Sequence, residues 1–172
     1  MATLTTIDAD IAALLEHGAK IIPVFKGQKR PVGSGWPALA TDDEAAIAAW
    51  IRRGNIGICL GHGNLIDIEY DDHDAYECFM QLEVGDGTLL HEIETPTWQS
   101  ARGCHRLYRL AEELPDVATI KNQGVEFRIG GRAAQSVLPP SLHATGYRYN
   151  WLVSPQQCGP AVVTLADLGI DY

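Results

Sequence analysis

Residues 64–71 read Asn-Leu-Ile-Asp-Ile-Glu-Tyr-Asp, and this stretch decides the fold. Apolar and acidic residues alternate along it: Ile66, Ile68 and Tyr70 against Asp67, Glu69 and Asp71. Side chains of a strand point alternately to its two faces. The stretch therefore predicts a strand with one apolar face, suited to a core, and one face that carries three carboxylates.

Three carboxylates on one face repel one another, so a nearby positive charge must compensate them. A divalent metal such as Mg²⁺ is the usual partner, because hard cations take oxygen ligands. The alternative is a half-buried edge strand whose acidic face is solvated. The stretch alone does not separate these two interpretations, so the rest of the chain must.

The chain has 172 residues, of which 46% are hydrophobic, so a packed core is expected in one domain or two small lobes. No apolar run approaches the ~18 residues that cross a bilayer. Met1 to Ile7 lacks the pattern of a secretory signal, which predicts a cytoplasmic protein without a membrane segment. The four cysteines form no Cys-x-x-Cys pair, which argues against a zinc site and a disulfide framework.

The formal net charge of −9 argues against indiscriminate binding to nucleic acid. The charges are unevenly distributed along the chain. Ten acids and no Lys or Arg lie between His62 and Trp98, whereas seven basic residues and six acids follow from Gln99 onward. The acidic middle needs counterions, which bound metal could supply, and the later cations could face an anionic ligand. The weak overall basicity predicts that the domain alone holds nucleic acid loosely.

Apolar periodicity and turn residues divide the chain into short elements. Expected strands lie at 21–25, 55–61, 64–71, 106–110, 125–129, 135–138 and 147–152. Expected helices follow Asp8 as a cap, the capping box Thr41–Glu44, and Asp72, with a further short one at 89–93. The tight turn between 55–61 and 64–71 predicts that these two strands pair as neighbours.

These elements predict an α+β or mixed α/β fold, with helices covering one face of a mainly antiparallel sheet. We expect residues 1–172 to form a single domain with its core at about 8–152 and a peripheral tail at 153–172. The loop 26–40 carries three cations near Trp36, which could meet a phosphate or a base. The alternative for this loop is a solvated segment with Trp36 in the core.

Polar residues elsewhere complete a constellation with the acidic strand. Glu126 lies on a second strand, and His105 follows a glycine-containing turn with Arg102 close before it. Paired carboxylates with a histidine and an arginine suit phosphoryl transfer, in which two metals ~3.5–4 Å apart act on the attacking and leaving oxygens. The alternatives are a core histidine at position 105 and a Glu126 that is buried against Arg128.

Six segments, taken together and in this order, resemble a known family. They are Pro23–Trp36, 55–61, 65–71, Thr95–His105, 125–128 and Pro139–His143. The set resembles the N-terminal domain of the bifunctional DNA primase/polymerases (Prim-Pol), which belong to the archaeo-eukaryotic primase superfamily and occur in phages and plasmids. The resemblance implies a primase-like fold, with an RRM-like catalytic module and a small N-terminal α/β lobe.

The resemblance also implies roles for individual residues. In the family, an acidic pair and a third carboxylate bind two divalent ions, here Mg²⁺ or Mn²⁺, and a histidine contacts the phosphates of the incoming nucleotide. Glu126 then corresponds to the third carboxylate and His105 to the phosphate contact. Glu69 and Asp71 are the preferred acidic pair, and Asp67 remains a candidate ligand on the same face. Further nucleotide contacts implied by position are Ser100, Arg102 and Arg132.

The resulting expectation is a template-dependent nucleotidyltransferase that joins nucleoside triphosphates on single-stranded DNA in phage or plasmid replication. A helicase region or a helicase protein is a further expected partner. Two alternatives use the same residues. One is a non-catalytic replication-initiation module that binds nucleic acid, and the other is a metal-dependent phosphoesterase. The turn Ser-Ala-Arg-Gly at 100–103 departs from the Ser-Gly-Gly of the family, although it keeps a glycine before the Cys-His pair.

Overall fold

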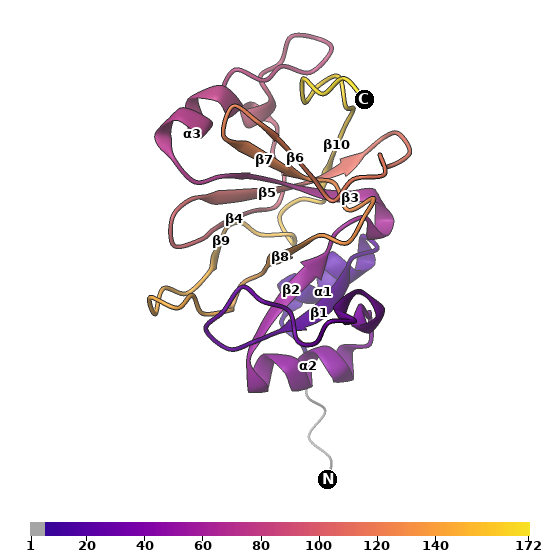
Figure 1. Cartoon of the computed structure of the whole chain (residues 1–172), viewed down its shortest axis with the longest axis vertical. Helices are drawn as coiled ribbons and strands as arrows, with labels where there is room; N and C mark the ends of the chain where they lie inside the picture. The colour runs from indigo at the N-terminus through magenta and orange to yellow at the C-terminus, as the bar shows by residue number, and fades with distance from the viewer. Residues whose placement is uncertain (1–5) are drawn as a thin grey trace.

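The computed structural model describes residues 6–172 and shows an α+β fold built on two sheets (Figure 1). The expected fold class is confirmed, because pairing in both sheets is antiparallel except at one strand. Most of the stretch Met1 to Ile7, which lacked a signal pattern, lies outside the described residues. Within residues 6–172, no helix has the length and apolar character needed to span a bilayer.

The smaller sheet forms the lower lobe in Figure 1, together with two helices. Its strands, in the order β1-β2-β8, are β1 (Lys20–Val24), β2 (Asn55–Cys59) and β8 (Gln135–Val137). The helices are α1 (Ala9–Glu16) and α2 (Glu44–Arg53), and a 3₁₀ turn (Trp36–Leu39) precedes α2. Asp8 caps α1 as predicted, since its carboxylate accepts a hydrogen bond of 2.8 Å from the backbone N–H of Asp10.

The larger sheet runs in the order β6-β7-β3-β5-β4-β9, and β10 pairs with β5 in parallel. Its strands are β3 (Leu65–Tyr70), β4 (Thr97–Gln99), β5 (Cys104–Leu110), β6 (Thr119–Asn122), β7 (Val125–Arg128), β9 (Asn150–Val153) and β10 (Ala161–Val163). Two 3₁₀ turns (His62–Asn64 and Leu90–Glu92) flank the helix α3 (His73–Phe79), which packs on β3 and β7.

Apolar and acidic side chains alternate along β3, as the sequence predicted, so one face joins a hydrophobic core and the other carries the candidate site residues. Ile66 and Ile68 are fully buried and pack with Phe79 of α3 in the core of the larger lobe. Leu65 on the opposite face joins the core of the smaller lobe. Asp67 shares that face, so the acidic side of β3 points into the junction between the two sheets.

The predicted pairing of 55–61 with 64–71 is wrong, because β2 and β3 belong to different sheets. β2 has β1 and β8 on its two edges, and β3 has β5 and β7, so neither strand has a free edge. The connection turns at Gly61 (φ 92°) and Gly63 (φ 62°), conformations that favour glycine. A tight glycine turn here moves the chain from one sheet to the other instead of closing a hairpin.

Two smaller predictions also need correction. Asp43, and not Thr41, is the N-cap of α2, because its carboxylate accepts from the N–H of Ala45 at 3.1 Å while the Thr41 hydroxyl accepts from Asp43. The tail is not peripheral, since β10 joins the larger sheet and Leu168 is fully buried in its core. The tail strand has only three residues, too few to show a period.

Candidate active site

The register of the larger sheet places four side chains in one row across neighbouring strands: three predicted site residues and one tryptophan. Glu126 of β7 lies opposite Glu69 of β3, and Glu69 lies opposite His105 of β5. Trp98 of β4 lies opposite His105 on its other side. Directly opposed residues of antiparallel strands have Cβ atoms ≈ 4.5–5.5 Å apart, so the two glutamates and the histidine face one another.

Asp67 lies two residues before Glu69 on the same face of β3, and its side chain is completely buried. Its Oδ2 accepts hydrogen bonds from Nδ1 of His105 at 2.7 Å and from the hydroxyl of Ser136 at 2.5 Å. Nη1 of Arg128 lies 3.9 Å from the same oxygen. Its other oxygen, Oδ1, is buried without a hydrogen bond from residues 6–172. Asp67 therefore fixes the position of the His105 ring through Nδ1.

His105 is held on three sides and is only 2% exposed. Its ring stacks on Trp98 with centroids 4.8 Å apart and planes within 5°. Its Nε2 lies 3.4 Å from Oε1 of Glu69, while Nδ1 donates to Asp67. The indole N–H of Trp98 donates to the carbonyl of Val137, which fixes the stacking surface to β8. Both ring nitrogens of His105 thus face carboxylates.

Arg128 links the carboxylates on the other side of the row. Its guanidinium forms an ion pair with Glu69, although Oε2 of Glu69 has no hydrogen bond of good geometry. Its Nε donates to Oε1 of Glu126 at 2.9 Å, and Nζ of Lys121 lies 3.0 Å from Oε2 of Glu126. Nη1 also donates to the hydroxyl of Ser136 at 3.0 Å. The acidic row is therefore compensated by two cations of the chain itself.

The environment shifts the pKa values within this group in opposite directions. Burial opposes ionisation of Asp67, yet His105 and Arg128 lower the pKa of this carboxyl below its ordinary value. Burial raises the pKa of Glu69, and the neighbouring Asp67 carboxylate adds to that effect. Burial would lower the pKa of His105, but the carboxylates of Asp67 and Glu69 raise it. These opposing effects favour an imidazolium at His105 beside an ionised Asp67.

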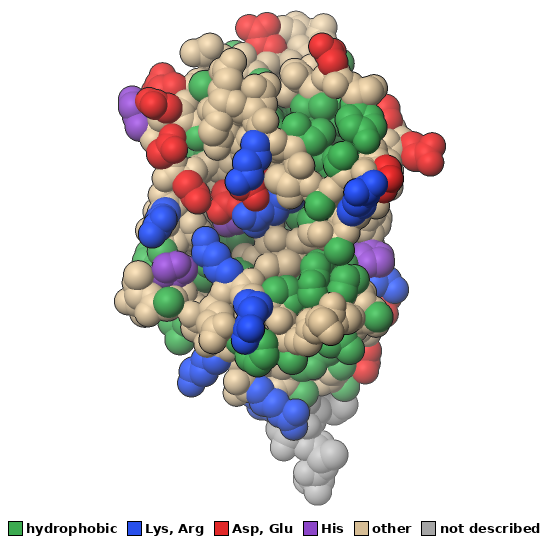
Figure 2. Space-filling view, in the orientation of Figure 1, with side chains coloured by type: hydrophobic (Ala, Val, Ile, Leu, Met, Phe, Trp, Pro, Cys, Tyr) green, Lys and Arg blue, Asp and Glu red, His purple; other side chains and the backbone are tan. Residues whose placement is uncertain are grey.

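A cleft of about 320 Å³ opens in front of Glu69, His105 and Arg128. Its other walls come from the smaller lobe and from the loop 26–40, which contributes Lys29 and Trp36. Figure 2 shows the hollow between the two lobes, with acidic side chains and a histidine at its upper rim and Lys and Arg side chains around it. An anionic ligand in this cleft would meet both a carboxylate group and cations.

Comparison with known proteins identifies the family. A model of the bifunctional DNA primase/polymerase N-terminal domain, Prim-Pol, matches residues 11–165. The chain belongs to the Prim-Pol family. A search of curated proteins gives no match. Prim-Pol membership supports a nucleotidyltransferase of the primase/polymerase type, and it implies nucleotides and a DNA template as partners. The resemblance inferred from the six sequence segments is thereby confirmed.

The buried residues of this Prim-Pol domain suit a divalent metal. Asp67, Glu69 and His105 each offer one ligand atom, and these atoms lie within 4.8 Å of one another. Carboxylate oxygens are the ligands that Mg²⁺ and Mn²⁺ prefer. The buried Oδ1 of Asp67 lacks a partner, which is costly unless something positive approaches it. Glu126, opposite Glu69, could add another oxygen, so the donor set fits a divalent ion.

The other predicted residues lie at different distances from the group. Asp71 follows the end of β3, is exposed and lines a separate shallow pocket with Arg102. Ser100 is buried, and its hydroxyl accepts from the N–H of Gly103 at 3.1 Å, so it holds the turn 100–103. Arg132 is exposed and pairs with Asp116 at 2.9 Å, outside the cleft lining. Their nucleotide contacts remain predictions.

Three members of the Prim-Pol site were not singled out for it from the sequence. Ser136 carries no motif, and only the pairing of β8 with β2 brings it to Asp67. Trp98 is fully buried, and its stacking on His105 depends on the register of β4 with β5. Arg128 was considered only as a partner of Glu126, and its link to Glu69 follows from the pairing of β7 with β3.

Proposed function

We propose that this Prim-Pol domain is a template-dependent nucleotidyltransferase that joins nucleoside triphosphates in phage or plasmid replication, with residues 1–172 acting as one catalytic domain. The 3′-hydroxyl of a strand, or a first nucleotide, attacks the α-phosphate of a bound triphosphate, and pyrophosphate leaves. The observation that carries the proposal is Glu69, which lies between Glu126 and His105 on adjacent strands and faces a cleft with Lys29 on its opposite wall.

In this proposal Glu69, Asp71 and Glu126 would hold two Mg²⁺ or Mn²⁺ ions. When bound, the ions activate the attacking oxygen and stabilise the leaving one. A catalytic ion keeps coordination positions open to substrate, which favours Glu69 at the cleft and the more exposed Glu126 and Asp71 over the enclosed Asp67, although Asp71 lines the neighbouring pocket. Asp67 is 0% exposed and already accepts two hydrogen bonds, so we assign it to the inner side, as a ligand of Glu69's ion or as a support for His105.

The remaining residues of the chain bind and orient. His105 is fixed by Asp67 and Trp98, and its imidazolium form offers positive charge toward the triphosphate. Lys29 lines the same cleft and adds a second cation. Ser100 and Arg102 support or extend the nucleotide site from the turn 100–103. Arg132 lies outside the cleft, and we propose that it contacts only a part of the nucleotide that extends beyond the cleft.

An incorporation assay tests the proposal against both alternatives. The protein is incubated with labelled nucleoside triphosphates, a single-stranded template and Mn²⁺, and products are resolved by length. Template-directed products support the proposal. Strand cleavage without synthesis would point to a phosphoesterase, and binding without chemistry would point to a replication-initiation module. Either of these two results contradicts the proposal.

Two asparagine variants separate the roles of the acidic residues. Asp71→Asn is expected to reduce incorporation strongly at unchanged melting temperature, because Asp71 is exposed and bonded to nothing that holds the fold. Asp67→Asn is expected to lower the melting temperature as well, because it weakens the anchor of His105. Full incorporation by Asp71→Asn would move the metal ligands to the Asp67–Glu69 pair.

One observation favours the non-catalytic alternative. Both oxygens of Glu126 already face cations, Arg128 and Lys121, and Arg128 also pairs with Glu69. A site that is internally compensated in this way needs no metal to be stable. The metal-binding proposal therefore requires that Arg128 yields part of its contacts when ions bind, which can be tested directly.

A further inference from the structure

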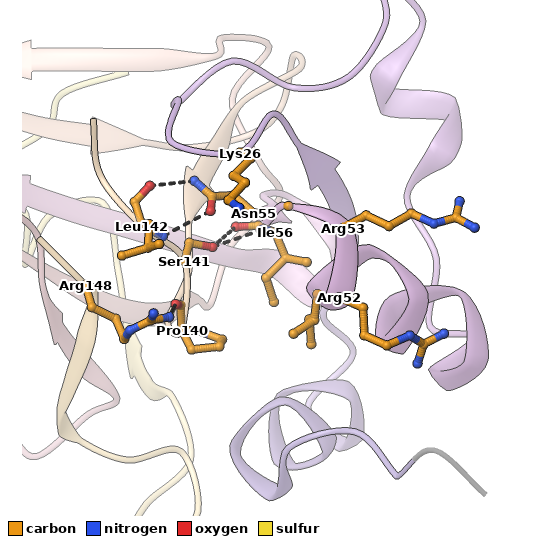
Figure 3. A pocket seen from close by; sticks show the side chains of 11 residues that line it. Lys26, Arg52, Arg53, Asn55, Ile56, Pro140, Ser141, Leu142 and Arg148 are labelled. Carbon is orange, nitrogen blue, oxygen red and sulfur yellow. Dashed lines mark hydrogen bonds between the residues drawn. The ribbon is translucent and has the colours of Figure 1, made fainter. Parts of the chain in front are cut away.

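A second pocket lies on the smaller lobe, away from the carboxylates. It has a volume of about 220 Å³ and lies between the C-terminal end of α2, the start of β2 and the segment Pro140–Leu142 (Figure 3). Four of its lining residues are cationic, and none is acidic: Lys26, Arg52, Arg53 and Arg148. We call it the basic pocket.

The four cations of the basic pocket are uncompensated. All four are exposed, and none forms an ion pair with any residue in the range 6–172. Only Arg148 has a side-chain hydrogen bond, which it donates to the carbonyl of Pro140 at 2.7 Å. In a chain with a net charge of −9, four unpaired cations around one pocket form a distinct local field.

The polar groups at the floor of the basic pocket already form hydrogen bonds within the protein. The Asn55 side chain donates to the carbonyl of Leu142 at 2.7 Å and accepts from its N–H at 3.0 Å. The Ser141 hydroxyl accepts from the N–H of Ile56 at 3.0 Å and lies 3.2 Å from its carbonyl. These polar atoms are satisfied within the protein, so the pocket offers a ligand mainly charge. Recognition by charge suits phosphates and carries little base specificity.

The basic pocket and the active-site cleft share the same chain segments. The loop after β1 places Lys26 in the pocket and Lys29 in the cleft, and Arg148 in the pocket precedes Tyr149 in the cleft. Two hydrogen bonds pin this loop between them, from Asn55 to the carbonyl of Gln28 at 3.1 Å and from Gln135 to the carbonyl of Lys29 at 2.8 Å. A bound strand could therefore follow one continuous wall from the pocket to the cleft.

A structural explanation accounts for only part of the cluster. Arg52 and Arg53 lie in the last turn of α2, where cations complement the helix dipole. Lys26 and Arg148 come from other segments and have no such role. Figure 2 shows that Lys and Arg side chains continue down the visible face of the lower lobe, where acidic side chains lie only at the right-hand edge.

We propose that the basic pocket binds the backbone phosphates of single-stranded nucleic acid independently of sequence and directs the strand toward the cleft. Figure 3 shows Arg52 and Arg53 extending away from Arg148, so the charges do not converge on one point. Dispersed charges fit successive phosphates of a strand better than the compact charge of one triphosphate. Only the role as a template path rests on the proposed function, since strand binding needs no catalysis.

Strand binding in EDTA tests the basic pocket without involving metal or synthesis. The affinity of a labelled oligonucleotide is measured by fluorescence anisotropy at several salt concentrations. The double variant Arg52→Gln/Arg148→Gln is expected to bind roughly tenfold more weakly and to lower the log–log salt slope by about 1.4, or about 0.7 for each lost phosphate contact. Lys20→Gln is the matched control, because Lys20 lies at the opposite end of β1 from Lys26 and should change neither value.

Two results would overturn the assignment. One is wild-type strand binding by the double variant, and the other is a loss confined to free nucleoside triphosphate, which would make the pocket a nucleotide site. If the double variant melts at a lower temperature, Lys26→Gln gives the same test, because no side-chain hydrogen bond or ion pair of Lys26 holds the described fold. Strand binding is measured in EDTA without nucleotides, so failure of the proposed chemistry leaves this measurement unchanged, and failure of this site is seen by itself.

Discussion

Replacing Arg128 is the change that most sharply tests how the carboxylates are kept together. Its guanidinium pairs with Glu69 and Glu126 and lies near Asp67, and its side chain is only 19% exposed. Arg128→Met keeps much of the apolar stem but leaves three carboxylates without their central cation. Removing one partner of a buried pair costs about 3–5 kcal/mol, and the partial exposure of this group places the loss near about 3 kcal/mol. For a domain of this size, that corresponds to a fall in melting temperature of roughly 6–12 °C.

Divalent ions should restore much of this loss. In EDTA the variant is expected to melt below the wild type, and Mn²⁺ should raise its melting temperature by more than it raises that of the wild type, because the ion no longer competes with Arg128. Thermal melts followed by circular dichroism, with and without Mn²⁺, measure both effects. Arg132→Met serves as the control, since that arginine forms an exposed pair with Asp116 and its loss should leave the melting temperature unchanged.

If Arg128→Met melts like the wild type in EDTA, the carboxylates need no cation and the role assigned to Arg128 is wrong. An equal rise of both melting temperatures in Mn²⁺ would also contradict that role. In that case either the ion binds at another site, or Arg128 and the ion do not compete for Glu69 and Glu126.

Three further changes test the surroundings of the site. Ser136→Ala should lower the free energy of unfolding by about 1.5–3 kcal/mol, measured by urea denaturation, because a buried hydroxyl donates to the ionised Asp67. Gly103→Ala should cost about 1–3 kcal/mol, since its Cβ would lie 2.2 Å from the carbonyl oxygen of Tyr70, whereas Gly85→Ala, with no atom within 4 Å, should be tolerated. The pKa of Asp67 lies below its ordinary 3.8 in the folded protein, so its contribution to stability is present above that pH and is lost as the pH falls through the folded value. Urea titrations between neutral and acid pH should show this loss in the wild type and a smaller one in Asp67→Asn.

Patterns within a single segment predicted the elements they belong to. The alternation of residues 64–71 correctly predicted a strand with an acidic face, and Asp8 and Asp72 cap their helices as expected. Such features depend on neighbours in the chain, which the sequence contains. Strands β4, β6 and β10, with three or four residues each, were missed, whereas β8, which is equally short, was predicted between a glycine turn and two prolines.

Relations between distant segments were harder to predict. The hairpin of β2 and β3 was wrong because a glycine turn can either close a pair or change sheets, and only the available edges decide. The row of Glu126, Glu69 and His105 depends on strand register, as does the hydrogen bond from Ser136 to Asp67. The family resemblance named members of this row, but their distances and partners could come only from the structure.

We propose that Glu69 holds divalent ions for template-directed nucleotide transfer. The most direct test compares Mn²⁺-dependent incorporation by Glu69→Gln with that by Glu77→Gln, an exposed glutamate on α3 that makes the same chemical change away from the cleft. Glu69→Gln is expected to give no detectable template-directed product while still folded at the assay temperature, with a melting temperature lowered by the loss of its ion pair with Arg128, and Glu77→Gln is expected to give wild-type product. Synthesis by folded Glu69→Gln at the wild-type rate would contradict the proposal.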